Sequence, residues 1–191
     1  MPSRHLYFVR HGLTDDGGLA DELGPPLNAT GIAQARLVAT WLSRLPIQVI
    51  HFSPLRRAAQ TADEIGGTLV GVPRHASPLL KECVPGFPLE YAAVFAHLAP
   101  ERIARDCQQV DEAFARFFVV PEESDRHEVV VCHGNIIRAL VMRVLRVAPE
   151  RWVHAVAHNA GITEVLVDSA GQQFLVSFNE TSHLPTELKT H

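Results

Sequence analysis

The sequence predicts an α/β fold with a mostly parallel central sheet flanked by helices on both faces. Short β-prone runs, rich in Val, Ile and Phe, alternate along the chain with segments whose apolar residues recur at helical spacing. Two of the runs end alike, in Val-Arg-His-Gly at residues 9–12 and in Val-Cys-His-Gly at residues 131–134. The 191 residues suffice for one full hydrophobic core, so we expect a single domain over residues 1–191.

Six strands are predicted, because each run is apolar and is bounded by turn-forming or charged residues. They cover residues 6–12, 48–52, 68–72, 128–132, 163–167 and 173–178. The last two should pair as a hairpin across the turn at residues 168–171. Residues 13–26 have the composition of a loop, and the polar tail at residues 181–191 is expected to be loosely held.

Four helices are predicted between these strands. The first begins after Asn28, which is a good N-cap. The second is expected to use Ser53 as its cap and to end near Ile65, before two glycines. Two further helices carry apolar stripes, one starting at Pro100 and one over residues 136–147.

The composition indicates a globular protein and gives no sign of a nucleic-acid-binding, disulfide-rich or membrane-spanning one. The formal net charge is -4, with 47% hydrophobic and 20% charged residues, which is typical of a globular protein and gives no reason to expect nucleic acid as a partner. The three cysteines show no paired spacing. No apolar run is long enough to span a bilayer, and no signal-peptide pattern is seen. We therefore expect a cytoplasmic protein without a membrane partner.

The two matching strand ends predict a shared site. Ligands of open α/β sheets bind beyond the carboxyl ends of the strands, so parallel neighbouring strands would bring His11 and His133 into one pocket beside Arg10. Arg57 lies in the first turn of a predicted helix, where backbone N–H groups also favour an anion. Guanidinium groups in such a pocket suit a phosphoryl group.

These residue types predict phosphoryl transfer. A neutral histidine nitrogen is a competent nucleophile toward phosphorus, whereas the arginines and a protonated His133 would stabilise the charge on the transferred group. The reaction also needs an acid that protonates the leaving oxygen. Glu82, in a predicted loop, is the best-placed carboxyl group for that role.

Five segments, taken in this order, resemble the histidine phosphatase superfamily, also called phosphoglycerate mutase-like. They are FVRHGLT at 8–14, LNATGIAQA at 27–35, SPLRRAAQT at 53–61, LKE at 80–82 and CHGNIIR at 132–138. The resemblance implies a phosphohistidine on His11 and no metal or organic cofactor. Thr14 and Gly134 are implied to bind substrate together with Arg10, Arg57 and His133. The implied catalytic residues are Arg10, His11, Arg57, Glu82 and His133.

Within the superfamily, residues 132–138, 149–152 and 159–163 resemble the mitochondrial serine/threonine-protein phosphatases. That branch carries an N-terminal membrane segment and a multimerisation motif, and we find neither in these 191 residues, so a catalytic domain alone is expected. Gly17 stands where cofactor-dependent mutases usually carry asparagine, and this favours hydrolysis over mutase activity.

Three functions stay open at this stage. The favoured one is a metal-independent phosphatase acting on phosphoproteins. The second is a phosphatase or mutase acting on a small metabolite, and the third is a phosphate-binding scaffold without catalysis. His154 and His158 have the i, i+4 spacing of a metal pair, but no acidic HExxH-type motif supports it, so a helix surface or pocket rim is preferred. A homodimer is also left open.

Overall fold

The computed structural model describes residues 1–15 and 22–191, and it confirms the predicted α/β class. A six-stranded sheet has the strand order β3-β2-β4-β1-β5-β6. The strands β1 to β4 are parallel, whereas β5 and β6 extend the sheet in antiparallel pairs. The strand bounds are β1 Arg4–Arg10, β2 Val49–Phe52, β3 Arg74–Ala76, β4 Arg126–Cys132, β5 Ile162–Val167 and β6 Gln173–Glu180. Gly17 and the middle of the predicted loop 13–26 lie outside the described residues.

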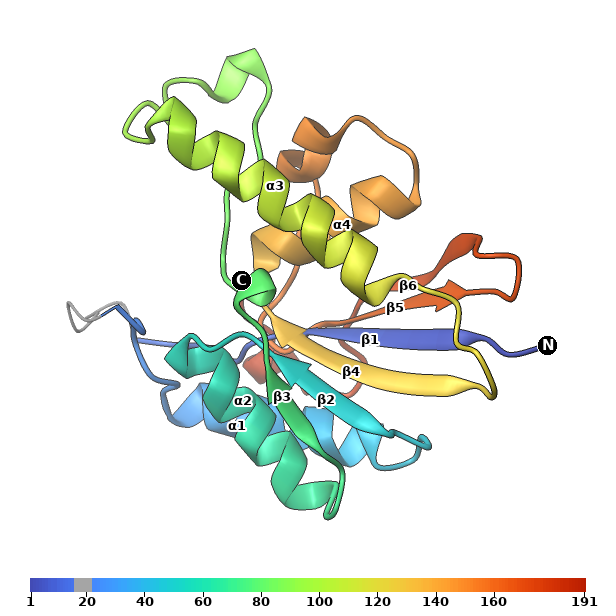
Figure 1. The fold of residues 1–191 in the computed structure, drawn as a ribbon. Coiled ribbons are helices and arrows are strands. Elements are labelled where there is room, and N and C mark those ends of the chain that lie inside the picture. The colour runs from blue at the N-terminus through green and yellow to red at the C-terminus, as the bar shows by residue number, and fades with distance from the viewer. Residues whose placement is uncertain (16–21) are drawn as a thin grey trace.

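Helices cover both faces of the sheet (Figure 1). Leu6 and Phe8 of β1 pack toward α3 and α4, and Tyr7 and Val9 pack toward α1 and α2, as the period of two in a strand requires. Within the described ranges, no helix combines the length and apolar character that crossing a membrane would require. The helix bounds are α1 Ala29–Leu42, α2 Arg56–Thr68, α3 Pro100–Phe117 and α4 Gly134–Val144, with 3₁₀ turns η1 Pro78–Leu80, η2 Leu89–Tyr91, η3 Pro149–His154 and η4 Thr186–Leu188.

Of the two predicted helix N-caps, Asn28 is confirmed and Ser53 is not. Asn28 caps α1, and its side chain accepts a hydrogen bond from the Gly31 N–H at 2.8 Å. The prediction for Ser53 is wrong, because α2 begins only at Arg56, with Leu55 at its N-cap and no side-chain cap. The Ser53 side chain is buried and turns toward the end of β4 instead.

The predicted strand at residues 68–72 is also wrong. Helix α2 continues through Gly66 and Gly67 to Thr68, and the strand β3 follows at residues 74–76, where it pairs with β2. Helical glycines cost about 1 kcal/mol each relative to alanine. Burial of Ala62 and Ile65 on the sheet offsets that cost and keeps the helix intact.

The polar tail at residues 181–191 is held in place, contrary to the prediction. Leu184 is buried in the core between the sheet and α1 and α2. The Gln34 side chain donates to Leu188 O at 2.7 Å, and Asn159 N donates to Thr190 O at 3.0 Å. The C-terminus therefore lies at the edge of the sheet where the parallel strands end (Figure 1).

Two glycines let the end of β1 pack directly on the start of α1. A Cβ atom built on Gly12 would lie 2.4 Å from Gly31 O, and one built on Gly31 would lie 2.1 Å from Leu13 O. Neither position has room for a side chain, so the backbone at Gly12 and Leu13 packs directly against the backbone at Gly31. This contact fixes the turn that follows His11.

We predict that Gly31→Ala destabilises the protein by about 2 kcal/mol, because the added methyl group overlaps the Leu13 carbonyl. Gly67→Ala is the matched control, since a Cβ at Gly67 meets no atom within 4 Å and alanine favours the helix by about 1 kcal/mol. Urea unfolding of both variants measures the difference. Equal stabilities of the two variants would contradict the proposed contact.

Candidate active site

The parallel pairing of β1 with β4 brings the two strand-end histidines together. Arg10 is in register with Cys132, and His11 N donates to Cys132 O at 3.0 Å. The rings of His11 and His133 are 5.0 Å apart between centroids, at an interplanar angle of 62°. The expectation that these strands are parallel neighbours is confirmed.

His11 is held as a neutral ring. Its Nδ1 atom lies 2.8 Å from Gly12 O, and Arg57 Nε donates a hydrogen bond to its Nε2 atom at 3.0 Å. Nε2 is therefore the atom that carries the lone pair. Burial, followed by the charges of Arg57 and Arg10, lowers the pKa of His11 to about 3. The residue is only 6% exposed.

The surroundings of His133 also favour the neutral ring. The protonated ring expected beside a transferred phosphoryl group stays a prediction. Burial, then the neighbouring His11 and Arg57, lowers the pKa of His133. Its Nε2 lies 2.8 Å from Ser53 Oγ, which accepts a hydrogen bond from Leu55 N. A Ser53 hydroxyl that donates to Nε2 leaves the ring N–H on Nδ1. In the described part of the chain, Nδ1 is buried and has no hydrogen-bond partner.

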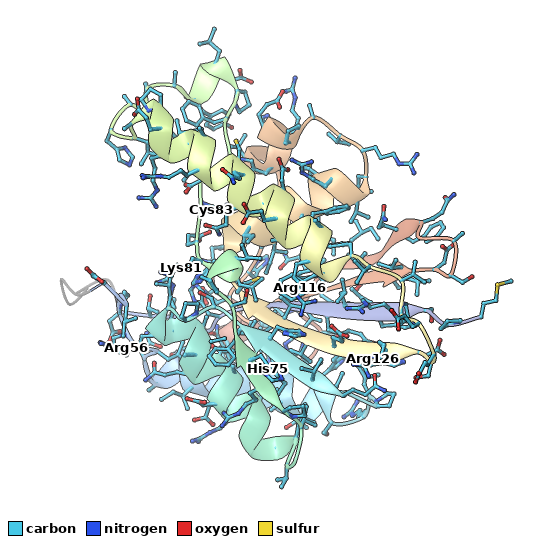
Figure 2. All side chains as sticks on the ribbon, in the orientation of Figure 1. Arg56, His75, Lys81, Cys83, Arg116 and Arg126 are labelled. Carbon is cyan, nitrogen blue, oxygen red and sulfur yellow. The ribbon has the colours of Figure 1, made fainter. Side chains whose placement is uncertain are left out.

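Glu82 lies on the connection between η1 and η2. Its neighbours in the chain, Lys81 and Cys83, are labelled in Figure 2. One carboxylate oxygen accepts from Asn135 N at 3.2 Å and from Cys83 N at 3.3 Å. Burial raises the pKa of Glu82 and outweighs the opposing effect of the two arginines of the site and these hydrogen bonds. The protonated carboxyl is accordingly favoured here.

The Arg10 side chain packs against Gly134, the first residue of α4. A Cβ atom on Gly134 would lie 3.5 Å from Arg10 Nε, and the guanidinium group donates to Ala157 O. Its Nε is buried and has no partner among the described residues. A pocket of about 190 Å³ opens beside it and is lined by Arg10, Glu82, Gly134, Asn135, Arg138, Val156, Ala157 and His191.

Several residues of the site were not identified from the sequence. Ser53 was interpreted as a cap, although it directly follows a strand as His11 does. Asn135 and Arg138 lie within the CHGNIIR segment but received no role. The Asn159 side chain donates to His11 O at 3.2 Å. No pattern in the sequence points to His191.

The remaining predicted residues lie as follows. Thr14 forms an antiparallel β-bridge with Leu27, and its contact with substrate stays a prediction. His154 ends η3, so it does not share a helix with His158, whose Nδ1 lies 2.6 Å from Asn179 Nδ2. Across residues 1–15 and 22–191, no group of three or more His, Cys, Asp or Glu side chains could hold a metal ion.

Comparison with known proteins identifies the family. The sequence model of the histidine phosphatase superfamily (branch 1) matches residues 6–181. The chain is 30% identical over 194 residues to the mouse mitochondrial serine/threonine-protein phosphatase PGAM5, covering 97% of this chain and 65% of that protein. The chain therefore spans somewhat less than two thirds of the length of this relative.

Solved structures with the same fold include phosphatases of small molecules. A putative alpha-ribazole-5'-P phosphatase from Escherichia coli superimposes with a TM-score of 0.75 at 21% identity, over 93% of this chain and 97% of that chain. A mycobacterial glucosyl-3-phosphoglycerate phosphatase does so with a TM-score of 0.68 at 25% identity, over 94% and 100%. These matches show the shared fold. The family model and the PGAM5 relative support the predicted enzyme class, a phosphoric monoester hydrolase. The model that matches is that of branch 1, and the chain belongs to the histidine phosphatase superfamily, as its sequence predicted.

Proposed function

We propose that the protein is a metal-independent phosphatase that hydrolyses phosphomonoesters through a phosphohistidine on His11. The observation that carries the proposal is the convergence of His11 with Arg57 at 3.0 Å and with the His133 ring at 5.0 Å, in a site whose arginines also act on the buried Glu82 carboxyl. The pKa of His11 is lowered and that of Glu82 is raised. A nucleophile must be unprotonated and a general acid protonated at the same pH, and this site favours both states.

In the first step, His11 Nε2 attacks phosphorus and the ester P–O bond breaks. Arg57 now donates to that nitrogen, so the attack requires Arg57 to redirect its donor to a phosphoryl oxygen. Arg10 Nε and the His133 Nδ1–H supply further donors for the transferred group. Glu82 gives its proton to the leaving oxygen.

In the second step, the Glu82 carboxylate takes a proton from water, and the water oxygen attacks the phosphohistidine. The P–N bond breaks, inorganic phosphate leaves, and His11 returns to its neutral form. The same carboxyl group thus acts first as acid and then as base. Its hydrogen bonds to Asn135 N and Cys83 N hold it at one position for both steps.

The favoured substrate is a phosphoprotein. Support comes from the mouse relative, a mitochondrial serine/threonine-protein phosphatase by name. A small-metabolite substrate is the alternative, and the mycobacterial glucosyl-3-phosphoglycerate phosphatase supports that choice. The cytoplasmic location and the homodimer stay predictions.

We predict that His11→Ala abolishes turnover of p-nitrophenyl phosphate and of phosphoserine peptides, because no other group attacks phosphorus. Excess EDTA should leave the wild-type rate unchanged. The wild-type enzyme should also show a pre-steady-state burst of p-nitrophenol equal to the enzyme concentration if hydrolysis of the phosphohistidine is slow. Residual His11→Ala activity within tenfold of the wild type, with an unchanged circular dichroism spectrum, would contradict the assignment.

Glu82→Gln should discriminate between leaving groups. Loss of a general acid typically costs about 10²–10⁴-fold in rate, and the loss is largest for poor leaving groups. We therefore expect a much larger decrease in kcat/KM for phosphoserine peptides than for p-nitrophenyl phosphate.

The pH profile provides a second readout for Glu82. Since its pKa is raised, the proton needed in the first step is lost only as the pH rises through that higher value. The wild-type rate of phosphohistidine formation should fall on the alkaline side, and the fall should be absent in Glu82→Gln. Equal losses for both substrates with an unchanged pH profile would exclude Glu82 as the acid.

A further inference from the structure

We call the pocket of about 190 Å³ beside Arg10 and Glu82 the phosphate pocket. A second pocket with mainly apolar walls adjoins it. Its volume is about 300 Å³, at the lower end of the range for ligand sites. Helix α4, the 3₁₀ turn η3 and the segment around η2 build its walls. The lining residues are Tyr91, Val94, Phe95, Asn135, Arg138, Trp152 and Val153.

The two pockets share Asn135 and Arg138, which lie one turn apart on α4. Side chains three positions apart on a helix are separated by about 5–6 Å, so the pockets are close neighbours. Asn135 N also binds Glu82, the proposed donor of the leaving-group proton. A group attached to the leaving oxygen would therefore emerge next to the apolar pocket.

Contacts among the side chains hold the floor of the apolar pocket. Trp152 is 3% exposed, and its Nε1 donates to Gly86 O at 2.7 Å. The Arg138 guanidinium lies over the indole at 4.7 Å, and the Phe95 ring is 6.0 Å from it. Phe87 stacks on Phe95 at 4.6 Å. The walls are thus formed before a ligand binds.

The Arg138 guanidinium group in the pocket wall already donates hydrogen bonds to protein oxygens. Arg138 donates from Nε to Gly134 O at 3.1 Å, from Nη1 to Ala155 O at 2.8 Å and from Nη2 to Asn135 Oδ1. These bonds use three of the five N–H donors of the guanidinium group. Apart from Arg138 and Asn135, the lining side chains are aliphatic or aromatic. The pocket therefore favours an apolar group over an anionic one.

The rim of the pocket leaves apolar side chains in solvent. Val94 is 61% exposed, and Leu89 in η2 is 89% exposed. Val156, which lines the adjoining phosphate pocket, is 52% exposed. Apolar surface gathered beside a catalytic pocket is typical of a place where a substrate docks.

We propose that this pocket binds a large apolar side chain of a phosphoprotein substrate, one or two residues from the phosphorylated residue. An extended chain advances about 3.3–3.6 Å per residue, so one or two residues span the short step between pockets that share Asn135 and Arg138. The inference rests on the proposed phosphoprotein phosphatase activity, and it adds the sequence preference of the substrate.

The test compares two phosphoserine peptides that carry either leucine or serine on both sides of the phosphorylated residue. The wild-type kcat/KM should be about tenfold to a hundredfold higher for the leucine peptide, as burial of one large apolar side chain provides. Val94→Asp should remove most of that preference, and its loss on the leucine peptide should exceed its loss on p-nitrophenyl phosphate at least tenfold. Val70→Asp, at a valine that is 87% exposed beyond α2, is the matched control and should retain the preference.

The other outcomes overturn the inference in distinguishable ways. Equal wild-type kcat/KM for both peptides would remove the subsite and leave the phosphatase proposal standing. Equal losses of Val94→Asp on all three substrates would show a general effect on the fold or the phosphate pocket. A rate that rises with chain length among alkyl phosphates, with both peptides poorly hydrolysed, would assign the pocket to a small metabolite. Turnover of none of these compounds would refute the proposed function itself.

Discussion

The site depends on the parallel register of β1 with β4. That register pairs Arg10 with Cys132 and so places the residues after both strands, His11 and His133, at the same level of the sheet. Strand β1 pairs on its other side with β5, so hydrogen bonds on both edges fix its position. A shift by one residue would turn every side chain of β1 to the opposite face, away from the helices it now packs against. The backbone contact between Gly12 and Gly31 fixes the chain where it leaves the sheet.

Burial reverses the usual order of protonation in this site. The ordinary pKa values are 6.5 for histidine and 4.5 for glutamate, so between them water favours an imidazolium and a carboxylate. Removal from water penalises both charged forms and instead favours imidazole on His11 and the carboxyl form of Glu82. The guanidinium groups of Arg10 and Arg57 retain the positive charge of the pocket. An incoming phosphoryl group would thus meet fixed cations, an unprotonated Nε2 that accepts from Arg57, and an available proton.

The sequence could predict features that depend on local pattern, such as the two strand ends and the Asn28 cap. It could not predict features decided by distant partners. Ser53 has the local signal of a helix cap, but its hydroxyl binds His133, which lies 80 positions further along the chain. The tail is polar, which usually indicates mobility, yet it is held largely through backbone carbonyls such as Leu188 O, which no side-chain pattern reports. The two helical glycines weaken α2 without ending it, because tertiary burial outweighs their propensity.

Different segments of the chain build the two pockets, so the groups proposed for catalysis and those proposed to bind the substrate side chain lie largely on separate segments. The phosphate pocket is lined by Arg10 at the end of β1, by residues of α4, and by Glu82, Val156, Ala157 and His191 from loops and the tail. The apolar pocket is built largely from the segments around η2 and η3, which ring contacts such as Phe95 with Trp152 hold together. Substitutions in these segments change the surface offered to the leaving group without moving His11 or Glu82. Such a division accounts for one fold serving a protein phosphatase in one relative and small-molecule phosphatases in others. Arg138 joins the two parts, because it is anchored on α4 and supports the Trp152 ring.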